Sequence, residues 1–418
     1  MQELSRYAVG LDIGTTTVRC IVGHVDAGAQ TPTIIGVGVT PNAGMRKGVI
    51  VNLVPTAQAI DKALEEAERM SGHQIDAATF SVNGAHILGM SSRGVVAVGT
   101  QGHEINEDDL MRVEEAATVV QLPANREILD VAPRSYQLDS QENIKDPLGM
   151  TGVRLEVDAH VITALTPHMK NLSKTAELTH TQVNRAVPAG LAAARAVLSQ
   201  QQMENGVLLI DLGGTTTNIA VYEEGDLQHV AVLPVGGVNI TNDLAIGLKT
   251  DLDVAEELKL KHAVALPSLR KAGESKLSVK VGKETYDFPA SEVDMIVEAR
   301  LEEMFEHINK ELKGIGRAAK LPGGVVLTGG GAHLRGVSDF AKEALQLAVR
   351  VGHSTGFSGV AEKVDEPQFA TALGLMLFDL EGAGAQGSHH GNTKTQHATA
   401  AMNTIGKKIT GILNKFRS

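Results

Sequence analysis

The chain has 418 residues, of which 43% are hydrophobic, and a formal net charge of −11 at pH 7. This length exceeds what one hydrophobic core usually serves, so two or three domains are expected. The negative charge, an aromatic content of 3% and the lack of tryptophan argue against nucleic-acid binding, which depends on cationic and stacking side chains. The single cysteine, Cys20, excludes a disulfide framework. Together with the lack of a signal-peptide pattern or a long apolar run, it favours the cytoplasm.

The first predicted element is a hairpin with a glycine turn. An apolar run over residues 7–11 leads into Asp12-Ile13-Gly14-Thr15-Thr16-Thr17, and alternating apolar residues follow. Glycine lets the backbone approach an anion closely, threonines add hydroxyl donors, and an aspartate can hold water around a divalent metal. This pattern therefore indicates a phosphate-binding turn.

Further elements of the first part follow in chain order. Residues 34–39 and 79–82 have strand patterns, and apolar spacing predicts a helix over residues 56–71. Short strands over 93–98, 127–136 and 153–164, with a helix capped by Asn106 and Asp109, predict a small inserted domain. A helix is expected over residues 189–201.

The same phosphate-binding phrase occurs again about 200 residues later, as Asp211-Leu212-Gly213-Gly214-Thr215-Thr216-Thr217. A helix-rich, charged insertion is predicted over residues 247–321, and a strand then leads into Thr328-Gly329-Gly330-Gly331. Bare backbone at such a turn suits a flat ring or a sugar. A last helix is expected over 368–380. The sequence therefore predicts two related α/β half-domains that hold the phosphates of a nucleotide between them.

The repeated phrase and the later glycine turn resemble the superfamily of actin, DnaK and the sugar kinases over residues 7–380. The resemblance implies an α/β fold of two actin-like (ribonuclease H-like) half-domains around a cleft that binds ATP with Mg²⁺. It implies that Glu256 and Lys259, one helical turn apart, flank the ribose and adenine. The nucleotide-binding residues expected are Asp12, Gly14, Thr15, Thr16, Thr17, Asp211, Gly213, Gly214, Thr215, Thr216, Asn218, Gly236, Gly237, Glu256, Lys259, Gly329, Gly330 and Gly331. Asp12 and Asp211 would hold the metal through water.

One segment departs from hydrolytic members of this superfamily. Val187-Pro188-Ala189 resembles the first connection between the halves, where active ATPases place a glutamate or glutamine that orients water. Valine cannot orient or deprotonate water, so ATPase activity is expected to be weak or absent, with no catalytic residue.

A phrase in the inserted domain makes the resemblance narrower. Residues 143–156, Asn-Ile-Lys-Asp-Pro-Leu-Gly-Met-Thr-Gly-Val-Arg-Leu-Glu, and residues 46–50, Arg-Lys-Gly-Val-Ile, are similar to the FtsA family of bacterial division proteins. That family implies these units: half-domain residues 1–83 and 163–204, inserted subdomain 84–162, second half-domain 205–246 and 322–381, second insertion 247–321, linker 382–401 and terminal helix 402–418.

The terminal segment carries an independent signal. Apolar residues from Met402 onward recur at helical spacing, and the chain after Glu381 holds five basic residues and no acidic one. This pattern predicts an amphipathic helix that lies on anionic lipid, although a helix docked on the protein's own core would share the spacing. The membrane-contacting residues expected are Ile405, Lys407, Lys408, Ile409, Ile412, Leu413, Lys415 and Phe416.

The FtsA resemblance implies a peripheral protein at the cytoplasmic face of the membrane, at the division site. It would polymerise with itself, bind the C-terminal tail of FtsZ near Arg300, and recruit later division proteins. The alternatives are a PilM-like scaffold of type IV pilus assembly, a small-molecule kinase and a DnaK-type chaperone. The terminal helix and the 143–156 phrase favour the FtsA-like function over these alternatives.

Overall fold

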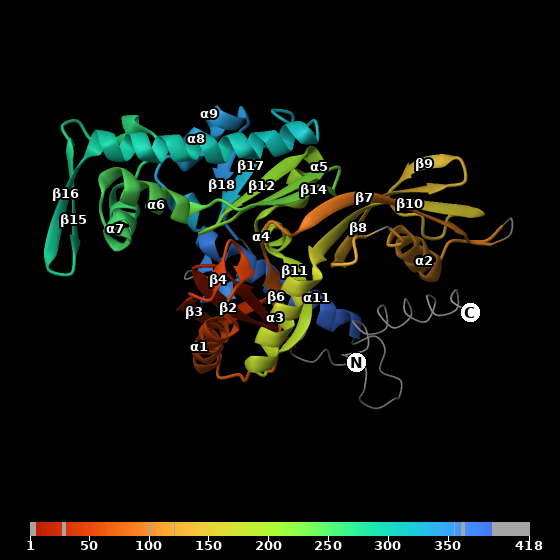
Figure 1. Ribbon diagram of the computed structural model, residues 1–418. Coiled ribbons are helices and arrows are strands. Elements are labelled where there is room, and N and C mark those ends of the chain that lie inside the picture. Colours follow the sequence, from red (N-terminus) through yellow and green to blue (C-terminus); the bar gives the residue numbers. More distant parts are fainter. Residues whose placement is uncertain are drawn as a thin grey trace.

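The computed structural model describes residues 6–26, 31–99, 102–120, 122–354, 356–360 and 364–386. Two half-domains lie one above the other, and a subdomain projects from one side of them (Figure 1). The predicted terminal helix, its membrane-contacting residues and most of the predicted linker lie outside the described residues. Among the described residues, no helix is both long and apolar enough to cross a bilayer.

The sheet of the first half has the strand order β11-β6-β1-β2-β3-β19. Strands β1, β2 and β3 form an antiparallel meander, whereas β6 and β11 run parallel to β1. The elements are β1 Arg6–Ile13, β2 Thr17–Val25, β3 Thr33–Pro41, β4 Met45–Arg46, β5 Val49–Ile50, α1 Leu53–Ser71, β6 Ala77–Val82, α3 Thr166–Leu178, β11 Gln182–Pro188, α4 Ala189–Val197, α5 Gln200–Asn205, β19 Ser358–Gly359 and α11 Ala370–Gln386.

The sheet of the second half repeats this plan in the order β14-β13-β12-β17-β18, again with three antiparallel strands followed by parallel ones. Its elements are β12 Val207–Leu212, β13 Thr217–Glu223, β14 Asp226–Leu233, α6 Gly237–Leu248, α7 Leu252–His262, β15 Lys276–Val281, β16 Glu284–Pro289, α8 Ala290–Gly314, β17 Val325–Thr328, α9 Val337–Leu345 and β18 Val349–Val351. The duplicated phrase in the sequence therefore reflects a duplicated half-domain.

The inserted subdomain is a four-stranded sheet with one helix against it. It contains β7 Leu88–Ala97, α2 Glu107–Ala117, β8 Arg126–Leu138, β9 Gln141–Ile144 and β10 Arg154–Leu165, in the sheet order β7-β10-β8-β9. The predicted cap of its helix is confirmed, because Asn106 Oδ1 accepts from the Asp109 amide at 3.1 Å and the Asp109 carboxylate accepts from the Asn106 amide at 3.3 Å.

Three elements differ in number, kind or length from what the sequence predicted. The helix expected over 189–201 is two helices, since Leu198 is extended and Ser199 caps α5. The charged 247–321 segment is helix-rich as expected, with α7 and α8, but it also contains the β15–β16 hairpin, which projects at one end of the molecule (Figure 1). Helix α11 continues to Gln386 and so includes residues 382–386 of the predicted linker.

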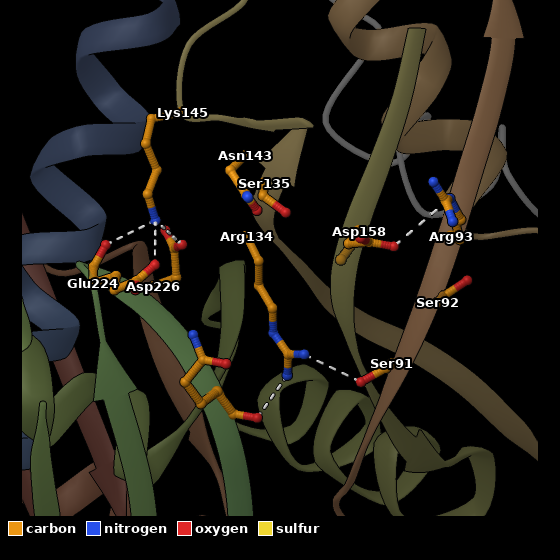
Figure 2. A pocket seen from close by; sticks show the side chains of 12 residues that line it. Ser91, Ser92, Arg93, Arg134, Ser135, Asn143, Lys145, Asp158, Glu224 and Asp226 are labelled. Carbon is orange, nitrogen blue, oxygen red and sulfur yellow. Dashed lines mark hydrogen bonds and ion pairs between the residues drawn. The ribbon is translucent and has the colours of Figure 1, made fainter. Parts of the chain in front are cut away.

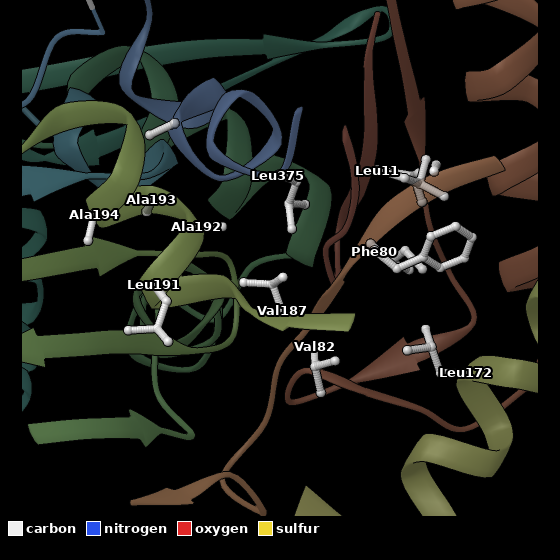
Figure 3. Close-up of a cluster of buried hydrophobic side chains, with 14 of the residues drawn as sticks. Leu11, Phe80, Val82, Leu172, Val187, Leu191, Ala192, Ala193, Ala194 and Leu375 are labelled. Atoms are coloured by element: carbon white, nitrogen blue, oxygen red, sulfur yellow. The ribbon is translucent and has the colours of Figure 1, made fainter. Parts of the chain in front are cut away.

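Small residues bring two helices together where the halves meet. A Cβ added to Gly374 of α11 would lie 1.7 Å from the Ala192 carbonyl of α4, so the two backbones touch. Figure 3 shows Leu191, Ala192 and Leu375 in the same buried cluster as residues of the first sheet. This dense contact fixes α4, the first connection between the halves.

Candidate nucleotide site

The two glycine hairpins have the same turn geometry. The Gly14 amide donates to the Thr17 carbonyl at 3.1 Å, and the Gly213 amide donates to the Thr216 carbonyl at 2.9 Å. A Cβ at Gly14 would lie 2.6 Å from that carbonyl oxygen, and one at Gly213 would lie 2.8 Å from its counterpart. Glycine is therefore required at both turns by close approach of the backbone.

The hairpins meet across the two halves. The Thr215 hydroxyl donates to the Thr15 hydroxyl oxygen at 2.8 Å, and Thr15 also accepts from the Gly48 amide at 3.0 Å. Nearby, the Asn83 amide group donates to the Thr216 hydroxyl oxygen at 3.2 Å. The predicted juxtaposition of the two phrases thus occurs in the structure, with the 46–48 turn and the start of the inserted subdomain beside it.

A cavity of about 510 Å³ opens at this junction. The predicted residues that line it are Asp12, Gly14, Thr15, Thr16, Thr17, Asp211, Gly213, Gly214, Thr216, Gly237, Glu256, Lys259, Gly329, Gly330 and Gly331. They come from both half-domains and from the second insertion, so the fold gathers segments that are hundreds of residues apart.

Three predicted residues do not line the cavity and instead support residues that do. Thr215 contacts the opposite hairpin, and Asn218 donates to the Asp211 carboxylate at 2.9 Å. Gly236 lies beneath the second hairpin, where a Cβ would come within 2.5 Å of the Gly213 carbonyl. These positions hold the site in shape rather than face a ligand.

Two carboxylates, the buried Asp211 and the partly buried Asp12, lie in the cavity wall. Burial raises the pKa of Asp12, which the nearby Arg19 charge and a hydrogen bond from Ser81 oppose. Burial also raises the pKa of Asp211 to about 6, opposed by the hydrogen bond from Asn218 and by Arg19. The neighbouring groups thus offset only part of the cost of burying these negative charges, and a divalent cation would supply the missing positive charge. Oxygen-only donors of this kind suit Mg²⁺, so the residues fit the predicted metal.

The third glycine turn presents bare backbone to the cavity. Gly329 has a φ of 80°, in the left-handed region, and a Cβ there would lie 2.3 Å from the Asp211 carboxylate. A Cβ at Gly330 would meet nothing within 4 Å. Gly330 therefore borders open space, as expected where a ring or a sugar would lie.

Glu256 and Lys259 lie at the side of the cavity on α7. The Lys259 ammonium donates to Glu256 at 2.7 Å, to the Thr241 hydroxyl at 2.9 Å and to the Gly237 carbonyl at 3.2 Å. The Lys259 side chain is only 14% exposed. The Glu256 side chain is 42% exposed, but both residues line the cavity, so the pair forms part of its wall.

Several polar residues that line the cavity, among them Arg19 and Asn83, were not expected from the sequence. Arg19 lies opposite Asp12 in the β1–β2 register, lines the cavity and has a buried Nε without a hydrogen-bond partner. Asn83 follows β6 and also lines it. Arg19 could have been predicted as a cavity residue from the register of the hairpin, because it pairs with Asp12 and directly paired residues share one face of a sheet.

Val187 lies in the hydrophobic core and not in the cavity wall. It is 1% exposed and packs among the residues of Figure 3. The cavity residue on this connection is Ala189, two positions later. The expectation that Val187 faces the cavity is therefore wrong, and Ala189 is the residue of this connection that does so. Because alanine cannot orient or deprotonate water either, the expectation of weak hydrolysis is unchanged.

Arg300 lies on α8 and is held by neighbouring acids. Its Nε donates to Asp243 of α6 at 2.5 Å, its Nη1 donates to Glu303 at 2.8 Å, and its side chain is 18% exposed. The same two helices carry exposed apolar side chains, Ile246 at 77% and Met295 at 63%. Arg300 therefore joins α6 to α8 through an ion pair with Asp243.

Comparison with known sequences and structures places the chain in a family. Residues 208–374 match the family described as Cell division protein FtsA, and residues 84–163 match the SHS2 domain inserted in FtsA. The Cell division protein FtsA of Pseudomonas aeruginosa is 38% identical over 91% of this chain and 90% of its own length. The chain belongs to the FtsA family. The FtsA of Bacillus subtilis is 40% identical over 91% of this chain and 84% of its own length.

Solved structures agree with this FtsA-family assignment at the level of fold. The chain is similar to the PilM-PilN type IV pilus biogenesis complex, with a TM-score of 0.65 at 17% identity over 89% of this chain and 98% of that one. For MreB5 of Spiroplasma citri bound to ADP, the TM-score is 0.55 at 13% identity over 92% of this chain and 99% of that one. For the MamK double helical filament, the TM-score is 0.50 at 12% identity over 89% of this chain and 98% of that one. The predicted actin-like fold with an inserted subdomain is thereby confirmed.

Proposed function

We propose that this chain binds Mg-ATP in the cavity between its half-domains and works as a scaffold of cell division. The observation that carries the nucleotide proposal is the meeting of two equivalent glycine hairpins, Thr15 against Thr215, at a cavity lined by Asp12 and Asp211. Phosphates would lie against the hairpin amides, and Asp12 and Asp211 would hold the metal through water. Glu256, Lys259 and the Gly329–Gly331 turn would border the ribose and adenine.

A variant that fills the cavity tests this assignment. Gly330→Leu should block a fluorescent ATP analogue without disturbing the fold, because its side chain would enter open space. Gly314→Leu is the matched control, since a Cβ there also meets nothing within 4 Å but lies at the end of α8, away from the cavity. Equal binding of the analogue by both variants and the parent would show that the nucleotide binds elsewhere.

The family and the terminal sequence support a membrane role. The curated relatives are division proteins, and the predicted helix over 402–418 carries apolar residues beside Lys407, Lys408 and Lys415. One short helix should bind lipid modestly, so stable attachment needs several copies, which self-association supplies. The chain's likeness to a filament-forming fold supports that self-association.

The proposed partner is the C-terminal tail of FtsZ, with later division proteins joining the assembly at the cytoplasmic face of the division site. The tail would dock on α6 and α8, the helices that carry Arg300 and the exposed apolar side chains Ile246 and Met295. Co-sedimentation of FtsZ with anionic vesicles tests the complete proposal. FtsZ should sediment with the vesicles only when this chain is present with its residues 402–418. The Met295→Asp variant should remain on the vesicles but no longer bring FtsZ with it. Co-sedimentation of FtsZ with a variant that lacks residues 402–418 would contradict the proposal.

A further inference from the structure

The inserted subdomain touches both half-domains although it is connected to only one. Its first and last strands, β7 and β10, join the chain at the first half, next to β6 and α3. Its sheet nevertheless reaches the β13–β14 turn of the second half. Arg134 and Lys145 of the inserted subdomain make these polar contacts, with residues 224–228 on the other side (Figure 2). These residues are called the docking contact below.

Arg134 forms the centre of the docking contact. Its Nε donates to the Leu227 carbonyl at 2.9 Å, and its Nη2 donates to the Gln228 carbonyl at 2.6 Å. The same guanidinium bonds Ser91 at 3.2 Å and His160 at 2.7 Å, both within the inserted subdomain. One planar group with several fixed donors therefore joins two strands of the subdomain to the backbone of the second half.

Lys145 adds an ion pair at the edge of the docking contact. Its ammonium donates to the Asp226 carboxylate at 2.5 Å and to the Glu224 carbonyl at 2.9 Å. Lys145 belongs to the 143–156 phrase singled out in the sequence, for which the nucleotide site provides no role. Because it is half exposed, this pair contributes less than Arg134 and should weaken with salt.

The other side of the subdomain is fixed to the first half. The Arg126 guanidinium donates to the His86 carbonyl at 2.6 Å and the Thr163 carbonyl at 3.0 Å, which bridges the two strands that enter and leave the subdomain. Asp130 pairs with Arg185 of β11 at 3.1 Å. A rotation of one half against the other would therefore strain or break the docking contact.

We propose, on the basis of the proposed nucleotide function, that Arg134 and Lys145 hold the two half-domains at the angle that brings the phosphate hairpins together, and so slow nucleotide release. The hairpins depend on that angle, because Thr15 bonds Thr215 and Asn83 bonds Thr216 across the halves. Arg134 and Lys145 are positioning residues, since neither lines the nucleotide cavity. The coupling is reciprocal, so bound nucleotide also stabilises the docking contact.

The test measures dissociation of a fluorescent ATP analogue, chased with excess ATP, from the full chain. Arg134→Ala should release the analogue about five- to fiftyfold faster, within the usual range of coupling between two sites, and Lys145→Glu should give a smaller acceleration. Arg93→Ala is the matched control, because Arg93 lines the same surface pocket as Arg134 and Lys145 but bonds Glu156 and Gln137 within the subdomain. Unchanged release in both variants, or an equal acceleration in Arg93→Ala, would overturn the proposal.

Charge reversal separates a lost contact from a damaged fold. Lys145→Glu with Asp226→Lys recreates the ion pair in the opposite sense, so the double variant should release the analogue at close to the parent rate. Failure of this rescue would exclude the Lys145 contribution. Hydrogen exchange should also show that nucleotide protects residues 224–228 in the parent, and unchanged exchange there would contradict the coupling. A parent chain that binds no analogue would refute the nucleotide function itself, whereas parent binding with unaffected variants would refute only this inference.

Discussion

Replacing Asp211 by asparagine should stabilise the nucleotide-free protein while weakening nucleotide binding. The Asp211 side chain is buried, and its pKa is raised from 3.8 to about 6. A shift of about two pKa units corresponds to roughly 3 kcal/mol of cost for the ionised form at pH 7. Asp211→Asn removes this charge and can still accept the hydrogen bond from Asn218. The free energy of unfolding should therefore rise by about 1–3 kcal/mol.

The same substitution removes a charge that would face the metal. Mg-ATP affinity should fall by about 1–3 kcal/mol, as expected for a lost charge-assisted contact. Urea unfolding in EDTA measures the first effect, and titration with a fluorescent ATP analogue in Mg²⁺ measures the second. Asp76→Asn, at an exposed position, is the control and should change neither quantity. A variant that is less stable than the parent, or that binds Mg-nucleotide as tightly, would refute this reasoning.

Three further results are expected. Because Ala189 occupies the connection that faces the cavity, ATP turnover by the purified chain should stay below about 1 per second, and a rate in the ordinary enzyme range would contradict this. Phe416→Glu should release the protein from anionic vesicles in flotation assays while ATP binding persists, and continued flotation would favour a core-docked tail. Burial lowers the pKa of His86 to about 4, so its neutral form is favoured in the folded state and stability is lost as the pH falls from about 6.5 towards 4. When the pH falls from 7.5 to 5.5, the free energy of unfolding measured in urea should therefore decrease by about 1 kcal/mol less in His86→Gln than in the parent. Equal decreases would exclude His86 as a cause.

Local chemical signals in the sequence were sufficient for the turns and for much of the cavity. The two Asp-x-Gly phrases and the Thr328–Gly331 turn lie where their patterns indicated, because a glycine turn after a buried strand depends on only a few neighbouring residues. The Asn106 cap followed from the same kind of local rule. The helix break before Ser199 also has a local signal, a capping box with Gln202, which the apolar spacing obscured.

Contacts between distant segments could only be decided by the tertiary structure. The family resemblance singled out Arg300, but its ion pair with Asp243 of α6 became visible only in the tertiary structure. Arg134 carried no signal at all, since its partners are carbonyl groups some 90 residues away on β14. Sequence patterns record which residues are apolar, flexible or charged. Which charge meets which backbone group depends on how the two half-domains and the inserted subdomain pack, and that packing joins residues that no local pattern relates.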